Sequence, residues 1–537
     1  MPTNALAIAE VLSDRGVRRC FGHPGGEIVA FMDACKRVGI EFILVGHEES
    51  AAFMADAAGS LNGIPGVCIS TLGPGATNLV TGIANAFLDR SPVVAVTAQV
   101  STKLDRSYGH QRLDLNALFA PVTKWTVTVD GHGTSAITER AMDLAQQPRR
   151  GPVHIALPSD LAIEEGISPE PTMSLPELDS PAGPAESAIA RAALLISEAE
   201  RPMALVGLGA RRDAVGPALR RFLETFGMPF LTTPKAKGII DESHPLFVGI
   251  ISGMAGDNAI LQILDECDLL LGVGFDPVEC DKDWFAKRRF VNIDDTNLAG
   301  ATCPAESGVI GDIAATLEAL ADRFIPTSRR SWTQRDARIR RERVMHAVQA
   351  RSVPRLGLSP HAVLTRLQEV LPDDAIVACD VGSHKLLIGQ IWRTHHPGTF
   401  LMSNGLSAMG FGLPAAIAAR LEYSDRPVLC VTGDGGFLMV LHNLELMVRR
   451  KIPVVVAVFA DRTLAAIKIA QDRRGLSSYG VDFGRPDYTA IAQAFGATGR
   501  RVEKLDEVGP VYREALASGM PTVLDIPIDP GEYWDQM

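Results

Sequence analysis

Cysteine, aromatic residues and long apolar runs are all scarce in this 537-residue sequence. The eight cysteines, at positions 20, 35, 68, 267, 280, 303, 379 and 430, show no CxxC spacing, which argues against a cysteine-ligated zinc site and favours small buried thiols in a reducing compartment. The longest apolar runs, such as Val454 to Ala460, fall far short of the roughly 20 residues that a membrane-spanning helix needs. The first residues carry no basic stretch followed by an apolar core, so we expect a cytoplasmic protein.

Positive charge is also in short supply, with 52 lysines and arginines against 63 aspartates and glutamates and a net charge of -11. Nucleic-acid binding needs clustered cations that neutralise phosphates, and the basic clusters here, Arg149-Arg150 and Arg338 to Arg343, are short or interrupted by acidic residues. We interpret them as solvated helix faces, and we expect neither a nucleic acid nor a membrane as partner. The remaining composition, 46% hydrophobic with 49 glycines, is that of an ordinary α/β protein.

The length of the chain exceeds what one hydrophobic core usually supports, so several domains are expected. Residues 167 to 186 contain five prolines, and residues 326 to 360 are polar and rich in arginine, so we interpret both segments as linkers. They leave domains at 1–165, 187–325 and 360–537. Continuous apolar runs that alternate with helical patterns predict three doubly wound parallel-sheet domains of the α/β class. The predicted strands include residues 92–97, 203–206, 269–273, 376–378 and 454–459.

The strongest local signal is the run VLCVTGDGGF from Val428 to Phe437, a buried strand followed by a helical pattern from about Leu438. Glycines at such a turn let backbone amides approach a phosphate, and the helix N-terminus favours the anion. Asp434, between Gly433 and the pair Gly435-Gly436, would repel a phosphate unless it holds a hard cation that bridges to a diphosphate.

A second carboxylate follows the next predicted strand. Asp461 stands 27 residues after Asp434, a distance that suits one helix and one parallel crossover, so both acids are expected at neighbouring strand ends facing one metal. The alternative is that the glycines form a tight turn and Asp434 caps a helix.

Glu48 follows another predicted strand, from Phe42 to Val45, and starts a helix rich in small residues. A carboxylate at such a position can exchange a proton with a ring nitrogen, although a plain helix-start carboxylate is the alternative. Two glycine turns flank it: FGHPGG, which includes Gly25, and LGPGATN, which places Asn78 at a helix start.

The order of these motifs resembles the thiamine-diphosphate-dependent decarboxylase and carboligase family along essentially the whole chain. The resemblance implies a pyrimidine-binding domain, a central domain and a diphosphate-binding domain, in that order. It also implies small 2-oxo acid substrates, and a homodimer or homotetramer whose active sites form between the first domain of one subunit and the last domain of another.

The resemblance also assigns roles to individual residues. Glu48 matches the glutamate that hydrogen-bonds the aminopyrimidine ring, while Asp434, Asp461 and the carbonyl of Thr463 match the metal ligands. In the run GLSAMGFGLP from Gly405 to Pro414, Met409 matches the apolar residue that bends the cofactor, and Ser407 matches the position whose carbonyl meets the amino group. Met409 as an ordinary core residue is the alternative. The remaining cofactor-binding residues implied are Gly25, Asn78, Gly382, Ser383, His384, Gly433, Gly435 and Gly436.

Three stretches resemble the catabolic, flavin-independent acetolactate synthases within this family: residues 109–124, 274–284 and 481–499. The first contains the pair His110-Gln111, where decarboxylases that release free aldehyde tend to carry paired histidines. Gln111, with His110, would then face the reacting intermediate. The resemblance thus implies decarboxylation of pyruvate and joining of the two-carbon unit to a second 2-oxo acid.

Departures from the family pattern leave alternatives open. Ala460 replaces the first of two asparagines usual before the metal loop and removes a hydrogen bond, and the acceptor-side arginine and tryptophan of the flavin-containing synthases are missing. A 2-oxo acid decarboxylase or an acyl transferase with another acceptor therefore stays an alternative, and a non-catalytic homologue is a further one. Lys468 is a candidate for meeting a substrate carboxylate, with a solvated lysine as the alternative.

The cofactors expected are thiamine diphosphate and a divalent metal. Mg2+ is the expected ion, because only oxygen ligands are proposed. The run VGLG from Val206 to Gly209 lacks the third close glycine and the ribose-binding acid of a dinucleotide site, so we do not expect FAD.

Overall fold

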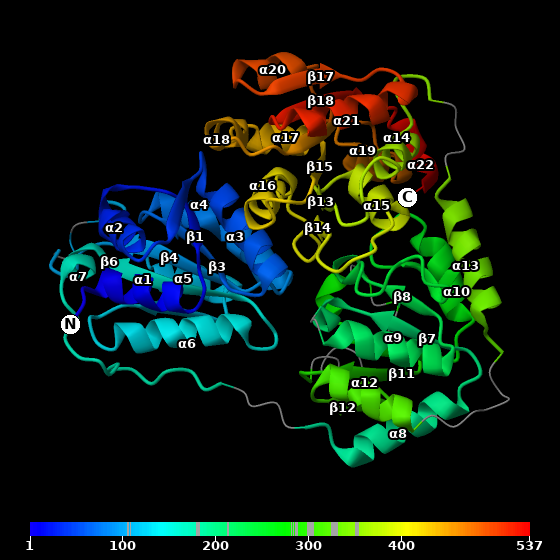
Figure 1. Ribbon diagram of the computed structural model, residues 1–537, viewed down its shortest axis with the longest axis horizontal. Coiled ribbons are helices and arrows are strands. Elements are labelled where there is room, and N and C mark those ends of the chain that lie inside the picture. The colour runs from blue at the N-terminus through cyan, green and yellow to red at the C-terminus, as the bar shows by residue number, and fades with distance from the viewer. Residues whose placement is uncertain are drawn as a thin grey trace.

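The computed structural model (Figure 1) describes residues 1–536 apart from 105–106, 108, 179–182, 212–213, 281, 283, 285–287, 298–304, 324–330 and 350–353. It contains three six-stranded sheets in which every strand pair is parallel, each flanked by helices. This confirms the predicted fold class. Helices cover both faces because the strands carry apolar residues on both sides.

The first domain holds the sheet with strand order β2-β1-β3-β4-β6-β5. Its strands are β1 (Arg19–His23), β2 (Glu41–Leu44), β3 (Gly66–Ser70), β4 (Val93–Gln99), β5 (Trp125–Thr128) and β6 (Pro152–Pro158). Its helices are α1 (Asn4–Asp14), α2 (Val29–Arg37), α3 (Glu48–Asn62), α4 (Pro74–Leu88), α5 (Leu115–Phe119), α6 (Thr134–Gln146) and α7 (Ser159–Ile163).

The central domain has the order β12-β11-β10-β7-β8-β9, which reverses direction between β7 and β10 as in dinucleotide-binding folds. Its strands are β7 (Pro202–Val206), β8 (Phe230–Thr232), β9 (Phe247–Ile250), β10 (Leu269–Val273), β11 (Phe290–Asp294) and β12 (Ser307–Ile310). Its helices are α8 (Glu186–Glu198), α9 (Val215–Phe226), α10 (Asp257–Asp265) and α12 (Ile313–Asp322).

The last domain has the order β14-β13-β15-β16-β18-β17, so its strands follow the same sequence of positions as those of the first domain. Its strands are β13 (Ile376–Cys379), β14 (Phe400–Met402), β15 (Val428–Gly433), β16 (Val455–Ala460), β17 (Thr498–Arg501) and β18 (Thr522–Pro527). Its helices are α14 (Pro360–Gln368), α15 (Ser383–Ile391), α16 (Gly412–Glu422), α17 (Asp434–Val440), α18 (Asn443–Arg450), α19 (Ala465–Arg473), α20 (Tyr488–Ala494), α21 (Val508–Ser518) and α22 (Gly531–Gln536).

One hydrophobic core joins the first and last domains, because α3 packs against α16. Both helices are rich in buried alanine, which lets their backbones approach closely. Phe53 and Phe411 add an edge-to-face contact, with ring centroids 5.7 Å apart. The first domain is therefore fixed against the last domain of its own chain.

Two predictions about local structure were wrong. The segment 326–360, interpreted as a linker, contains helix α13 (Gln334–Ala347), which packs against β9 and α10. Arg340 there lies over the ring of Trp332 and pairs with Glu266 at 2.7 Å, so its charge is used in packing rather than left in solvent. Helix α17 begins at Asp434, not near Leu438, because glycines are tolerated in a first helical turn.

The other sequence expectations concern cysteine and the membrane. Cys20, Cys35, Cys68, Cys379 and Cys430 are buried, Cys267 and Cys280 are partly buried, and none of these seven described cysteines forms a disulfide; Cys303 lies outside the described residues. None of the helices in the described part of the chain has the length and apolar character needed to cross a bilayer.

Candidate active site

The first domain places Glu48 at the start of α3, directly after β2, as the sequence predicts. Its side chain is 7% exposed, and its Oε2 accepts a hydrogen bond from Asn78 at 3.0 Å. A Cβ added at Gly75 would stand 3.2 Å from Glu48 Oε1, so the absence of a side chain there keeps the carboxylate accessible from the glycine turn. Gly25 lies against Thr71 on the other side of the same turn.

Gln111 also meets this turn. Its backbone adopts a φ of 54°, which is uncommon for a non-glycine residue, and a Cβ at Gly73 would stand 3.0 Å from its Cβ. Gln111 and His110 are exposed in the single chain. Glu48, Asn78, Gly75, Thr71 and Gln111 form what we call the glutamate cluster.

The last domain brings Asp434 and Asp461 to neighbouring strand ends, because β15 pairs with β16 and Gly433 lies opposite Phe459. Asp434 Oδ2 accepts from the N–H of Arg462 at 2.7 Å, and Asp461 Oδ1 accepts from the N–H of Thr463 at 3.1 Å. These bonds fold the segment after β16 around the two acids. Arg462 adopts a φ of 63°, the left-handed turn that this fold requires.

Both aspartates have raised pKa values. Burial raises the pKa of Asp434 to about 6, and burial together with the charge of Asp434 raises the pKa of Asp461 to about 7. Two desolvated carboxylates at neighbouring strand ends form a donor set suited to a hard divalent cation, which takes oxygen ligands. The residues present therefore fit the expected metal.

A glycine cradle lies next to the two aspartates. A Cβ at Gly435 would stand 3.1 to 3.4 Å from the side chains of Leu464, Met409 and Phe483, so three apolar groups converge over the glycine turn. Any larger residue at Gly435 would close this space. Met409 thus lies at the glycine turn beside the two aspartates, and its wedge role stays a prediction.

Two buried polar atoms at the start of α15, Ser383 Oγ and His384 Nε2, have no hydrogen-bond partner among the residues that the structure describes. Burial lowers the pKa of His384 to about 4, so the ring is neutral at pH 7. Its ring lies against Gly433 and Gly382, where added Cβ atoms would stand 3.2 and 2.7 Å away. An unpartnered hydroxyl donor at a helix N-terminus beside a glycine cradle fits a diphosphate.

The segment from Ser403 to Gly410, which we call the cofactor loop, carries Ser407 and Met409. Ser407 has a φ of 55°, and its Oγ accepts from Lys385 Nζ at 3.1 Å. Asp380, at the end of β13, accepts from the N–H of Gly410 at 2.9 Å and lies 2.1 Å from where a Cβ on Gly436 would stand, so Gly436 leaves room for this carboxylate.

The structure thus gathers the predicted residues into two clusters. Hydrogen bonds of Glu48 and of the two aspartates each stay within their own domain. Four residues beside the predicted ones were not predicted from the sequence: Thr71, Asp380, Lys385 and Leu464. Phe483 lies in the stretch 481–499 that resembles the acetolactate synthases, but no role was predicted for it. Lys468 pairs with Asp482 at 2.9 Å, so the structure gives it a partner within the domain rather than a free ammonium.

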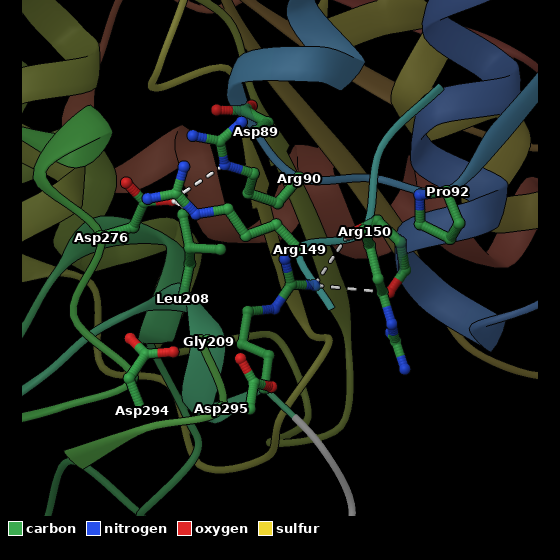
Figure 2. Close-up of a pocket in the computed structure, with 13 residues that line it drawn as sticks. Asp89, Arg90, Pro92, Arg149, Arg150, Leu208, Gly209, Asp276, Asp294 and Asp295 are labelled. Carbon is green, nitrogen blue, oxygen red and sulfur yellow. Dashed lines mark hydrogen bonds and ion pairs between the residues drawn. The ribbon is translucent and has the colours of Figure 1, made fainter. Parts of the chain in front are cut away.

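A cavity separate from the two clusters lies between the first and central domains, at the point where the central sheet reverses direction (Figure 2). Arg90 Nε pairs with Asp276 Oδ2 at 2.8 Å across this cavity, and Arg149 lies 3.7 Å from the same carboxylate. The N–H of Leu208, in the turn after β7, donates to Glu279 Oε2 at 2.9 Å. A protein carboxylate therefore already accepts from an amide of this turn, and the expectation of no flavin stays a prediction.

Comparison with known proteins gives one consistent result along the chain. Three models of the thiamine pyrophosphate enzyme family match: the N-terminal TPP binding domain at residues 3–118, the central domain at 189–320 and the C-terminal TPP binding domain at 380–526.

Full-length relatives are also found. A probable acetolactate synthase large subunit of Methanocaldococcus jannaschii is 35% identical, over 98% of this chain and 92% of the relative. The acetolactate synthase of Bacillus subtilis is 33% identical, over 98% and 93%. The catabolic acetolactate synthase of Raoultella terrigena is 31% identical, over 97% and 94%.

Proposed function

The chain belongs to the thiamine pyrophosphate enzyme family, and we propose that it is an acetolactate synthase that decarboxylates pyruvate and joins the two-carbon unit to a second 2-oxo acid. The family and the carboligase type follow from the matches above; the substrates are the proposal. The observation that carries it is the glycine cradle at Gly435, with paired carboxylates on one side and the unpartnered Ser383 and His384 on the other.

Thiamine diphosphate, when bound, supplies the carbon nucleophile and the electron sink that decarboxylation of a 2-oxo acid needs. We assign the metal to Asp434, Asp461 and the carbonyl of Thr463, with Mg2+ as the ion, which would neutralise the diphosphate charge. Ser383 Oγ would donate to the diphosphate, because no described residue partners it, and the His384 ring would line the same group. Met409, Leu464 and Phe483 would exclude water from one side of the cofactor.

Glu48 would exchange a proton with a ring nitrogen of the pyrimidine. Asn78 holds one carboxylate oxygen, which fixes the orientation of the group and leaves Oε1 at the glycine turn. Gln111 and His110 lie on the exposed side of the same turn and would orient the acceptor 2-oxo acid. Because the glutamate cluster and the metal residues form separate clusters in one chain, we propose a homodimer or a pair of dimers that joins them across subunits.

The direct test is to incubate the purified protein with pyruvate, thiamine diphosphate and Mg2+ and to quantify acetolactate, acetaldehyde and carbon dioxide. Cofactor-dependent acetolactate is the expected result. Carbon dioxide with acetaldehyde alone would show a decarboxylase instead. If neither product forms with pyruvate or with other 2-oxo acids although the cofactor binds, a non-catalytic homologue would be the better description.

The same preparation tests the cofactor set. We expect no flavin absorbance in the purified protein and no increase of activity on addition of FAD, because Glu279 occupies the turn after β7. A bound flavin would contradict this part of the proposal.

A further inference from the structure

The cofactor loop is held from outside its own domain by buried polar groups. Asp89 follows α4 in the first domain, and its Oδ1 accepts from the N–H of Gly405 at 2.7 Å and from that of Asn404 at 3.3 Å. Its Oδ2 accepts from Lys235 Nζ of the central domain at 2.9 Å. Lys235 Nζ also donates to the carbonyl of Met402, the residue before the cofactor loop, at 3.0 Å.

A second contact from the first domain reaches the same loop. Asn85 Oδ1 accepts from Ser403 Oγ at 2.5 Å, and Ser403 Oγ in turn accepts from the N–H of Ala408 at 2.8 Å. Asn85 is itself fixed by a 2.7 Å hydrogen bond from its amide to Asp56. Ala408 stands between Ser407 and Met409, so this chain of bonds ends between the two residues assigned to the cofactor.

The Asp89–Lys235 pair is fully desolvated, with side chains 1% and 6% exposed. Such a pair contributes little net stability, because desolvation offsets its attraction, and fixing one conformation is a better-attested use. The loop needs fixing, since Ser407 holds a left-handed backbone and Gly405 packs so tightly that a Cβ there would stand 2.7 Å from Leu88.

We propose that Asp89, with Lys235, is a positioning residue for cofactor binding: it holds the cofactor loop in the shape that presents Ser407 and Met409. This inference rests on the proposed cofactor site and does not depend on which acceptor is used. It also gives the first domain two roles, because Glu48 would serve the site of the partner subunit while Asp89 supports the site of its own chain.

The chain offers a matched control. Lys237 Nζ and Glu242 Oε2 form another fully buried pair, 2.9 Å apart and 1% and 2% exposed, and Lys237 Nζ donates to the carbonyl of Trp392. This pair also joins the central domain to the last domain, but its contacts there are with Trp392, Thr394 and the ring of Phe400, all outside the cofactor loop.

The experiment compares the double variants Asp89→Asn/Lys235→Met and Lys237→Met/Glu242→Gln, each of which removes both charges of its pair. Thiamine diphosphate binding to the apo protein with Mg2+ is measured by calorimetric titration, and amide hydrogen exchange of residues 403–410 is followed without cofactor. We expect at least about tenfold weaker cofactor binding and faster exchange in the first variant, from loss of roughly 1.4 kcal/mol of loop ordering. The control should show neither change, whatever its melting temperature.

Equal cofactor affinity and equal loop exchange in the two double variants would overturn the proposal. If the first variant does not fold, Ser403→Ala removes one neutral contact of the same network and should weaken cofactor binding in the same direction, and wild-type affinity in that variant would count against the proposal. A wild-type protein that does not bind thiamine diphosphate would instead refute the proposed function.

Discussion

Glu48 can lose its proton-transfer ability without losing its shape, because glutamine keeps an oxygen that accepts from Asn78. We predict that Glu48→Gln binds thiamine diphosphate nearly as well as the wild type but turns over at least about a hundredfold more slowly, the usual contribution of one general acid-base group. Calorimetric titration and initial rates with pyruvate measure the two effects separately. Near-normal turnover would remove Glu48 from the chemistry.

Because Glu279 is buried, we predict that the free energy of unfolding depends on pH. Burial raises the pKa of Glu279 to about 8, so between the ordinary value near 4.5 and about 8 the folded state binds a proton that the unfolded state has released. The contribution of Glu279 to the free energy of unfolding is then largest at low pH. It falls as pH rises through this window, by at most about 1.4 kcal/mol per pH unit.

The variant Glu279→Gln isolates this contribution, because it cannot titrate and still accepts from the N–H of Leu208. We expect the melting temperature of the wild type to fall more steeply between about pH 5 and pH 8 than that of the variant. Parallel curves for the two proteins would show that Glu279 is ionised in the folded state.

At the scale of elements, the loop after β16 is hydrogen-bonded to the segment Val481 to Phe483. Thr463 pairs with Asp482 in an antiparallel bridge, Thr463 Oγ1 donates to the carbonyl of Val481 at 3.1 Å, and the N–H of Phe483 donates to the carbonyl of Arg462. This fastening supports the metal loop although Ala460 provides no side-chain hydrogen bond, as the sequence indicates.

We predict that Thr463→Val weakens Mg2+ binding about fivefold, since one net hydrogen bond contributes about 1 kcal/mol. The matched control is Thr489→Val in α20, because the buried Thr489 Oγ1 has no partner. Magnesium titration of activity at saturating thiamine diphosphate measures both. Equal magnesium requirements in the two variants would show that the fastening does not support the metal loop.

Sequence patterns predicted the elements that depend on local order. The buried strand before Gly433 and the strand before Asp461 were predicted because continuous apolar runs identify parallel strands, and their adjacency followed from the length of the crossover. Helix α13 was missed because its polar, arginine-rich face packs through guanidinium stacking, which apolar periodicity does not detect.

Residues that depend on distant contacts could not be predicted. Asp380 supports Gly410 across 30 residues, and Asp89 meets Lys235 across 146 and Gly405 across 316. No spacing rule connects such positions, because the packing of distant segments brings them together, within the last domain for Asp380 and Gly410 and between domains for Asp89. Leu464 and Phe483 converge on Gly435 for the same reason.

For the whole molecule, the division of the site between two clusters predicts complementation. Glu48→Gln and Asp434→Ala should each be inactive alone. In a mixed dimer in which sites form across subunits, one site carries both substitutions and the other carries neither.

Co-expression of the two variants with different affinity tags tests this arrangement. Random assembly should restore about a quarter of the wild-type activity, because about half of the dimers are mixed and one of their two sites is intact. Activity that stays at the level of the single variants would place both clusters of a site in one chain.

The shared strand order of the first and last domains means that the chain uses one scaffold twice. In both, the third strand leads through a glycine N-cap into a helix whose second residue is glycine: Gly73-Pro74-Gly75 before α4 and Gly433-Asp434-Gly435 before α17. The two turns differ in backbone as well as in side chain, with a φ of 59° at Gly73 and of -76° at Gly433. Proline makes the first turn rigid and neutral, whereas aspartate gives the last turn the charge that the proposed cation site requires.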